Sequence, residues 1–163
     1  MSSQIISLSP PASALIQSLR SIGYDLKSAV ADIIDNSIAA DSSNIQINLF
    51  LDDAEKVVVV IGDDGNGMTP IELKQAMTLG SHNPLTIRKI DDLGRFGMGL
   101  KTASFSQCKT LTVITKKDEE LIGASWDLEH VTKANAWELF WLSKEQINQV
   151  VKKKKIEFQN NGT

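Results

Sequence analysis

Asp63-Asp64-Gly65-Asn66-Gly67-Met68 follows directly on the most strand-like run of the sequence, residues 56–61. Four valines and an isoleucine in that run are apolar and β-branched, which favours a buried strand. Glycine accepts positive φ angles and lets a backbone approach a ligand closely. The pattern therefore places the Asp63 carboxylate, which only accepts hydrogen bonds, at the end of a rigid strand and beside a tight turn. Alone, this turn does not establish a ligand site.

Size and composition restrict the class of protein. The chain has 163 residues, of which 42% are hydrophobic and 23% charged, the balance of a single soluble globular domain. A net charge of −3 gives no global sign of a nucleic-acid or membrane surface. The single cysteine, Cys108, excludes an internal disulfide and favours the cytoplasm, and the sequence shows no signal peptide. We expect one domain over residues 1–163, the N-terminal part of a longer protein, because the chain stops at a turn signal.

The order of hydrophobic periodicities predicts an α+β fold. Residues 51–55 form a polar connection, so the strands on either side of it are expected to pair antiparallel. Residues 80–93 show little periodicity, and a loop of that length in a compact domain is usually functional. Helices are expected over 11–22, 25–40, 69–79, 100–106 and 145–153, and strands over 45–49, 56–61, 110–115 and 120–126, with apolar edge structure at 139–142.

Two polar residues share one face of the expected second helix. Asp32 and Asn36 are four residues apart, so they lie one above the other. The Asn36 amide oxygen suits a hard cation such as Mg²⁺, and Asp32 could orient or deprotonate a water molecule. Asp35 lies on a neighbouring face. These residues alone are also compatible with an exposed helix surface that has no function.

A second glycine-rich segment, Gly94-Arg95-Phe96-Gly97-Met98-Gly99, leads into a helix. Backbone N–H groups at a helix N-terminus form a ready anion site, and Lys101 in the first turn could reach a phosphate. The segment does not follow a strand, which disfavours a Rossmann dinucleotide site, and the sequence has no G-x-x-x-x-G-K-[ST] phosphate loop. A flexible hinge is an alternative use of these glycines and is compatible with phosphate binding.

In this order and spacing, the three segments resemble the GHKL ATPases: gyrase, the ninety-kilodalton heat-shock chaperone, histidine kinases and MutL. Residues 31–37 (Ala-Asp-Ile-Ile-Asp-Asn-Ser) are similar to the N-box of that family. Residues 63–68 are similar to its first glycine box and residues 94–99 to its second. The local sequences Ile-Asp-Asn and Gly-Met-Gly-Leu-Lys look most like those of the MORC branch and its bacterial relatives. The resemblance covers roughly residues 24–126.

This resemblance implies a two-layer Bergerat sandwich, with helices packed on one face of a mixed, mostly antiparallel sheet. It implies a Mg²⁺-dependent ATPase that converts ATP and water to ADP and phosphate, with a lid at residues 80–93. Lid closure would gate homodimerisation of a larger protein through regions C-terminal to this chain. The residues implied are Asp32 as general base, Asn36 on Mg²⁺, Asp63 on the adenine amino group, Gly65, Gly67 and Met68 around adenine, and Gly94, Gly97, Met98, Gly99, Leu100 and Lys101 at the phosphates.

The sequence departs from the family pattern at two positions. The usual base is glutamate, so the shorter Asp32 predicts slow hydrolysis, and Ala39 stands where many relatives have an aspartate. Family members often bring a threonine to adenine on a later strand, and Gly162-Thr163 resembles its first residues. The isolated chain is expected to be weakly active or inactive. A non-catalytic nucleotide-binding or scaffolding domain is the alternative, whereas His82 and His130 are poorly placed for a histidine-kinase phosphotransfer.

Overall fold

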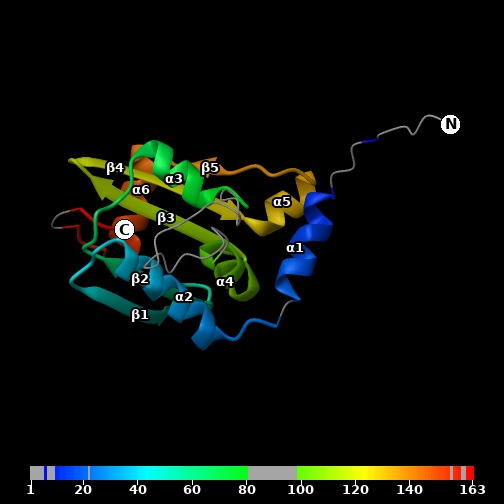
Figure 1. The fold of residues 1–163 in the computed structure, drawn as a ribbon, viewed down its shortest axis with the longest axis horizontal. Coiled ribbons are helices and arrows are strands. Elements are labelled where there is room, and N and C mark those ends of the chain that lie inside the picture. Colours follow the sequence, from blue (N-terminus) through cyan, green and yellow to red (C-terminus); the bar gives the residue numbers. More distant parts are fainter. Residues whose placement is uncertain (1–5, 7–9, 22, 81–98, 155, 159–160) are drawn as a thin grey trace.

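The computed structural model describes residues 6, 10–21, 23–80, 99–154, 156–158 and 161–163. Pairs of helices are followed by pairs of strands along most of it, as expected for an α+β fold (Figure 1). The helices are α1 (Ala12–Arg20), α2 (Leu26–Ala39), α3 (Pro70–Met77), α4 (Gly99–Gln107), α5 (Leu128–Ala134) and α6 (Lys144–Lys154). The strands are β1 (Ile45–Leu51), β2 (Val57–Asp63), β3 (Thr110–Lys117), β4 (Glu120–Asp127) and β5 (Phe140–Trp141).

Every strand pairing in the described part of the chain is antiparallel. β1 pairs with β2 from Ile45 opposite Asp63 to Leu51 opposite Val57, as the polar connection predicted. The second sheet has the order β3-β4-β5. The last residues join the two sheets: the Asp63 N–H donates to the Thr163 carbonyl (2.8 Å), and the Lys116 N–H donates to the Gly162 carbonyl (2.9 Å).

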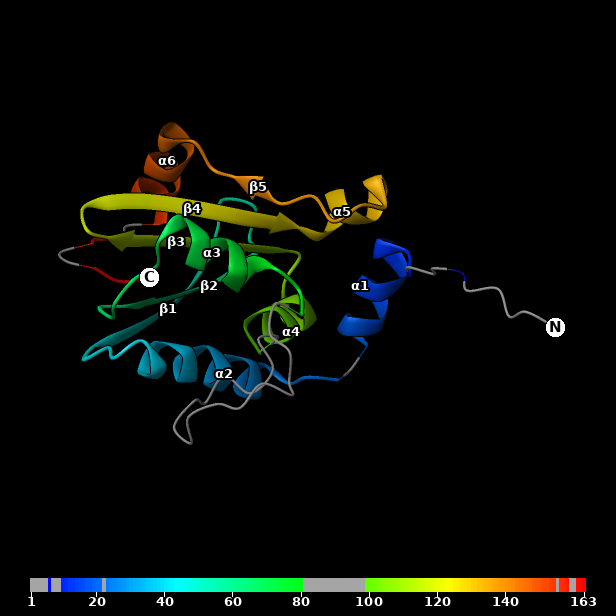
Figure 2. The ribbon, with the colours of Figure 1, turned by 45° about the horizontal axis from the view of Figure 1, so that its top comes forward.

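Helices cover both sides of this sheet arrangement. In Figures 1 and 2, α2, α3 and α4 lie on one face of the strands, and α6 lies on the other. The core lies between the helices on the first of these faces and strands β3 and β4. Leu73 and Met77 of α3 and Phe105 of α4 are fully buried there. Trp126 of β4 packs edge-on against Phe105, with ring centroids 6.3 Å apart. The α+β class is confirmed. Helices α2, α3 and α4 lie on one face of the strands, as expected, and α6 adds a helix on the other face.

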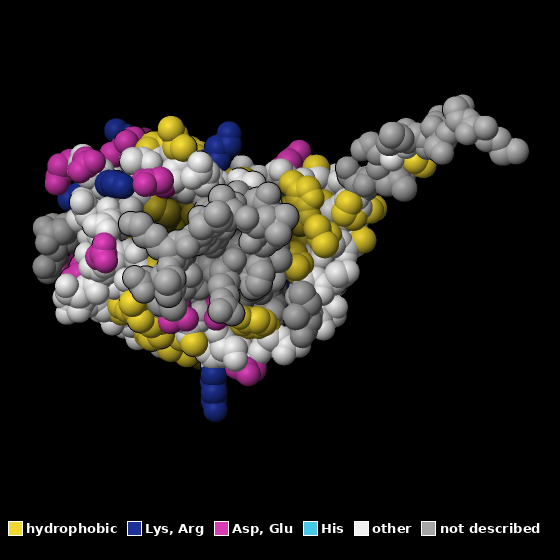
Figure 3. All heavy atoms as spheres, viewed as in Figure 1, with side chains coloured by type: hydrophobic (Ala, Val, Ile, Leu, Met, Phe, Trp, Pro, Cys, Tyr) yellow, Lys and Arg dark blue, Asp and Glu magenta, His cyan; other side chains and the backbone are white. Residues whose placement is uncertain are grey.

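Two details differ from the sequence-based expectation. The run 56–61 was expected to be a buried strand, yet Val57 is 68% exposed and Val59 is 36% exposed. Apolar side chains of β1 opposite them are also exposed, and Figure 3 shows hydrophobic side chains at the surface near β1, β2 and α2. Helix α5 was not predicted, because it has seven residues and no long periodic pattern. It begins where the Asp127 carboxylate caps the N–H groups of Glu129 and His130.

Helix α3 starts with the signals read from the sequence. Thr69 is its N-cap, Pro70 its first residue, and Glu72 completes a capping box. The Glu72 carboxylate accepts from the Thr69 N–H (2.7 Å) and hydroxyl (2.8 Å), and Lys117 Nζ lies 3.0 Å away. These bonds lower the pKa of Glu72 to about 2, and the bond from the Thr69 N–H has the largest effect. The cap fixes the end of the glycine turn to the start of α3.

Replacing Glu72 by Gln is expected to reduce the acid sensitivity of folding. Because the folded pKa lies below the unfolded value of 4.5, the carboxylate stabilises the fold above that value, and this contribution is lost as the pH falls from 4.5 towards 2. The side chain is 49% exposed, so solvent screening limits the effect to about 1 kcal/mol. In urea unfolding, Glu72→Gln should lower the free energy of unfolding at pH 6, and by clearly less at pH 3, where the contribution of the carboxylate is already partly lost. The exposed Glu120→Gln is the control, and an equal Glu72→Gln deficit at both pH values would contradict this account.

Candidate functional site

The Asp63 carboxylate is held between α2 and the glycine turn. The Ser37 hydroxyl, buried on α2, donates to Oδ2 at 2.9 Å. The Gly65 N–H donates to Oδ1 at 3.0 Å. Each carboxylate oxygen can accept more than one hydrogen bond, so Asp63 keeps acceptor capacity for a ligand. The position of Asp63 at the end of β2 agrees with the sequence-based expectation.

The two glycines of the turn are required by close backbone packing. A Cβ at Gly65 would lie 2.7 Å from the Ala40 carbonyl oxygen, and the Asn66 N–H donates to that same oxygen at 2.9 Å. Gly67 has a φ of +64°, and a Cβ there would lie 2.1 Å from the Lys116 carbonyl oxygen. The turn is therefore wedged between the end of α2 and β3, which the sequence alone did not indicate.

Asp64 supports the turn from its outer side. Its carboxylate accepts from the N–H groups of Ser43 (2.7 Å) and Asn44 (2.8 Å) and from the Asn44 amide (2.7 Å). These bonds hold the pKa of Asp64 below its usual range, and the bond from the Asn44 side chain has the largest effect. Sequence reasoning assigned Asp64 no role, although the polar turn before β1 supplies its donors. Asp64 is thus a structural anchor between the α2–β1 connection and the glycine turn.

A hollow of about 340 Å³ lies beside this turn. Three of its lining side chains are carboxylates, which would repel phosphate groups. It includes neither Asp63 nor the Asp32–Asn36 face, so we do not assign the candidate site to it. Its lining residues are Asp41, Asp64, Gly65, Asn66, Glu119 and Asn161.

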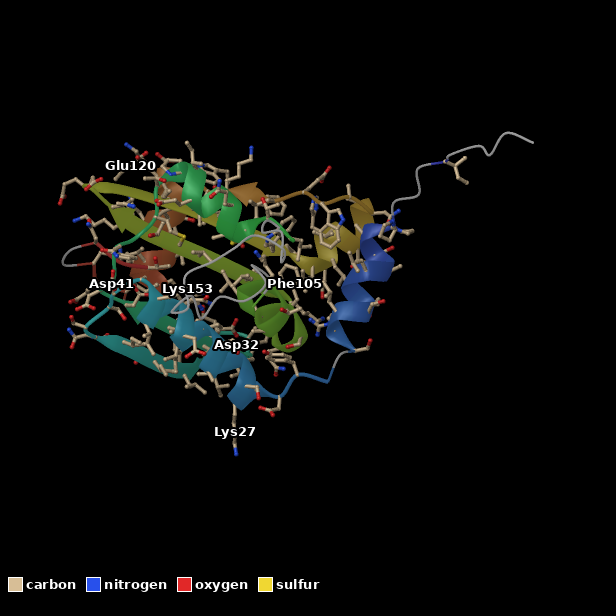
Figure 4. All side chains as sticks on the ribbon, in the orientation of Figure 1. Lys27, Asp32, Asp41, Phe105, Glu120 and Lys153 are labelled. Atoms are coloured by element: carbon tan, nitrogen blue, oxygen red, sulfur yellow. The ribbon has the colours of Figure 1, made fainter. Side chains whose placement is uncertain are left out.

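Asp32 and Asn36 lie one turn apart on α2, as predicted (Figure 4 labels Asp32). The Asn36 side-chain NH₂ donates to the Asp32 carbonyl at 2.9 Å, and within the described ranges Oδ1 of Asn36 accepts no hydrogen bond. The Tyr24 hydroxyl donates to Oδ2 of Asp32, and this bond raises the pKa of Tyr24. Gln107 of α4 donates in turn to the Tyr24 carbonyl. Sequence reasoning missed Tyr24, whose place before the helix gave no signal of this contact.

Thr163 lies next to the glycine turn. Its hydroxyl donates to Oγ1 of Thr115 at 3.0 Å, and the Met68 N–H donates to the same Oγ1 at 2.9 Å. Thr115 is fully buried and donates to the Gly162 carbonyl at 2.8 Å. A threonine near the turn was expected from the family resemblance, and its role towards a ligand stays a prediction.

The second glycine segment is described only in part. Gly94, Gly97, Met98, His82 and the predicted lid after Gly80 lie outside the described residues. Gly99 begins α4, and Leu100, like Met68, is partly buried and packs against the core. Lys101 is 2% exposed, and its Nζ donates to the carbonyls of Ala76 (2.7 Å) and Thr78 (2.8 Å). Burial lowers the pKa of Lys101 to about 8.

Comparison with known proteins identifies the family. A family model described as "Histidine kinase-, DNA gyrase B-, and HSP90-like ATPase" matches residues 24–163. The chain belongs to this family. The expected GHKL membership is thereby confirmed, and the match includes the N-box segment and both glycine segments. The chain thus carries an ATP-binding domain of the GHKL ATPase type.

The relatives of this GHKL domain include proteins of the MORC branch, which was also expected. It is 38% identical over 91 residues to ATPase morc-1 of Caenorhabditis elegans, covering 56% of this chain and 10% of that protein. It is 31% identical over 97 residues to mouse MORC family CW-type zinc finger protein 3, covering 58% of this chain and 10% of the relative. For human MORC family CW-type zinc finger protein 1 the identity is 33% over 98 residues, again covering 10% of the relative.

Within the described ranges, no helix is long and apolar enough to cross a membrane.

Proposed function

We propose that this GHKL domain binds ATP with Mg²⁺, hydrolyses it to ADP and phosphate, and couples the nucleotide state to dimerisation of a larger protein. The observation that carries the proposal is the Asp63 carboxylate, fixed at the end of β2 by Ser37 and the Gly65 N–H. A fixed acceptor of this kind suits the exocyclic amino group of adenine. The family match and the MORC relatives support the same nucleotide.

The adenine side would be formed by the turn itself. Asp63 would accept from the adenine amino group, and Gly65, Gly67 and Met68 would shape the pocket around the ring. Thr163 reaches the same region through its bond to Thr115, which also accepts from the Met68 N–H. These contacts would hold the turn in place on one side of the adenine ring.

The residues of α2 fit a magnesium ion bound mainly by the nucleotide. Asn36 offers one amide oxygen, and its NH₂ group is already held by the Asp32 carbonyl. Mg²⁺ prefers oxygen ligands in octahedral geometry, keeps several waters, and often takes only one or two protein groups beside substrate phosphates. When bound, Mg²⁺ would supply charge neutralisation at the phosphates, and Asn36 would orient it.

Asp32 is the proposed general base. Its carboxylate is positioned by the Tyr24 hydroxyl, and it lies one helical turn before Asn36. From there it would orient and deprotonate the attacking water. Gly94, Gly97, Met98, Gly99 and Leu100 would contribute phosphate contacts, and the same role for Lys101 stays an untested prediction.

Replacing Asp32 by Asn is expected to lower the rate of ATP hydrolysis by about 100-fold, because general base catalysis is worth that much or more. The affinity for ATP should change less than about threefold, since in this proposal Asp32 contacts neither the adenine ring nor the metal ion. Phosphate release under single-turnover conditions, with binding followed by calorimetry, measures both quantities. Asp35→Asn, an exposed carboxylate on the same helix, is the matched control. An unchanged rate in Asp32→Asn would show that Asp32 is not the base.

A nucleotide-binding domain without turnover is the second candidate. It is favoured by one observation: the Asp32 carboxylate, shorter than the usual glutamate, is already engaged by Tyr24. Tyr24→Phe separates the two proposals, because freeing the carboxylate should change the hydrolysis rate only if Asp32 acts on water. If the full-length protein bound ATP but hydrolysed it neither as the wild type nor as Tyr24→Phe, that result would support the second candidate.

A further inference from the structure

Lys101 occupies an unusual environment for a lysine. Its side chain is 2% exposed, and within the described residues it forms no ion pair with a carboxylate. The ammonium instead donates to the carbonyls of Ala76 and Thr78, at the end of α3. A buried ammonium is costly unless its hydrogen bonds are satisfied, so these two acceptors define its place.

The end of α3 is held by side chains of two other elements. The last carbonyls of a helix lack intrahelical partners and carry partial negative charge, so a cation or an N–H donor stabilises them. Lys101 of α4 bonds the carbonyls of Ala76 and Thr78, and the Trp126 indole N–H of β4 donates to the Met77 carbonyl between them (3.0 Å). Three successive carbonyls are thus bound from outside the helix.

Helix α3 connects this cluster to the glycine turn. The capping box at Thr69 begins directly after Met68, and Leu73 and Met77 fix the helix in the core with no exposed surface. Both ends of this short helix are therefore anchored, the first at the glycine turn and the last by Lys101 and Trp126. A change at Thr78 would therefore be transmitted to the turn that carries Asp63.

We infer that Lys101 is a positioning residue that holds the end of α3 against the first turn of α4, and so fixes the glycine turn at residues 63–68 relative to α4. This inference rests on the proposed nucleotide site and gives Lys101 a role that differs from a direct phosphate contact. It acts on the adenine side of the site, through α3, although the sequence places it beside the phosphate-side glycines.

The test compares ATP with adenosine, which has no phosphate. In Lys101→Met, the affinities for both ligands are expected to fall by the same factor, about tenfold, because the turn is displaced. Loss of a phosphate contact would instead lower the affinity for ATP and leave adenosine unchanged, and that result would overturn the inference. Trp126→Phe, which removes the neighbouring bond far from any phosphate role, should repeat the equal loss with a smaller factor. Lys109→Met, at an exposed lysine, should change neither affinity.

A measurement without nucleotide keeps the inference independent of ligand binding. Amide hydrogen exchange in residues 73–79 should accelerate at least tenfold in Lys101→Met, while exchange in β3 and β4 stays within twofold of the wild type. Unchanged exchange in α3 would overturn the inference. If the wild type bound neither ligand, the proposed function would fail, and the exchange experiment would still decide the role of Lys101.

Discussion

Replacing Asp63 by Asn is expected to lower the affinity of the chain for ATP by about 100-fold. Hydrogen bonds to a charged acceptor contribute about 1.5–3 kcal/mol, and the substitution removes the charge. The amide oxygen could accept from Ser37 or from the Gly65 N–H, but the NH₂ group would then face a donor where the carboxylate now accepts. The turn would lose one of its bonds as well as its adenine acceptor.

Fluorescence or calorimetric titration with ATP and GTP measures this effect and its origin. The wild type should prefer ATP, because guanine presents a carbonyl where adenine presents its amino group, and Asp63→Asn should lose that preference. Asp64→Asn is the adjacent control: the new amide oxygen can still accept from the Ser43 and Asn44 N–H groups, so the turn should stay in place. This substitution should lower stability and leave the ATP affinity within about threefold of the wild type. Equal ATP affinities in wild type and Asp63→Asn would remove Asp63 from the site.

Replacing Gly67 by Ala is expected to destabilise the fold by about 3 kcal/mol or more. A left-handed φ costs a non-glycine residue about 1–2 kcal/mol. At Gly67 the added Cβ would also lie 2.1 Å from the Lys116 carbonyl oxygen, a backbone atom that cannot rotate away. In a domain of this size that loss corresponds to a fall in melting temperature of roughly 10 °C.

Gly23→Ala provides the matched control for this strain. Gly23 has a similar φ of +75°, and no described atom lies within 4 Å of the Cβ position. Its substitution therefore measures the left-handed penalty without the clash. Scanning calorimetry of both variants should show a clearly larger loss for Gly67→Ala. Equal melting temperatures would mean that the turn does not pack on β3 as described.

The parts of the fold that were predictable have local signals. The β-branched run before Asp63 indicates a strand, and Thr69, Pro70 and Glu72 indicate a helix start through residues three positions apart. The four-residue spacing of Asp32 and Asn36 likewise places both on one face of α2. Spacing and order of these segments were sufficient to predict the α+β class and the GHKL family.

The parts that were not predictable depend on contacts between segments distant in sequence. Nothing near Gly67 in the sequence indicates that Lys116 will pack against it, and the Tyr24–Asp32 bond depends on how the chain enters α2. Lys101 shows the limit most clearly. Its place after three glycines suggests a phosphate ligand, whereas in the folded chain its amine donates to the carbonyls of Ala76 and Thr78 at the end of α3.

Calorimetric titration of the wild-type chain with ATP, first with Mg²⁺ and then with EDTA, tests the central claim most directly. We expect one ATP bound per chain with Mg²⁺ and an affinity at least about tenfold lower in EDTA, because Asn36 and the phosphates share the ion. Absence of binding at millimolar ATP, or binding that is unaffected by EDTA, would contradict the proposed Mg²⁺–nucleotide site.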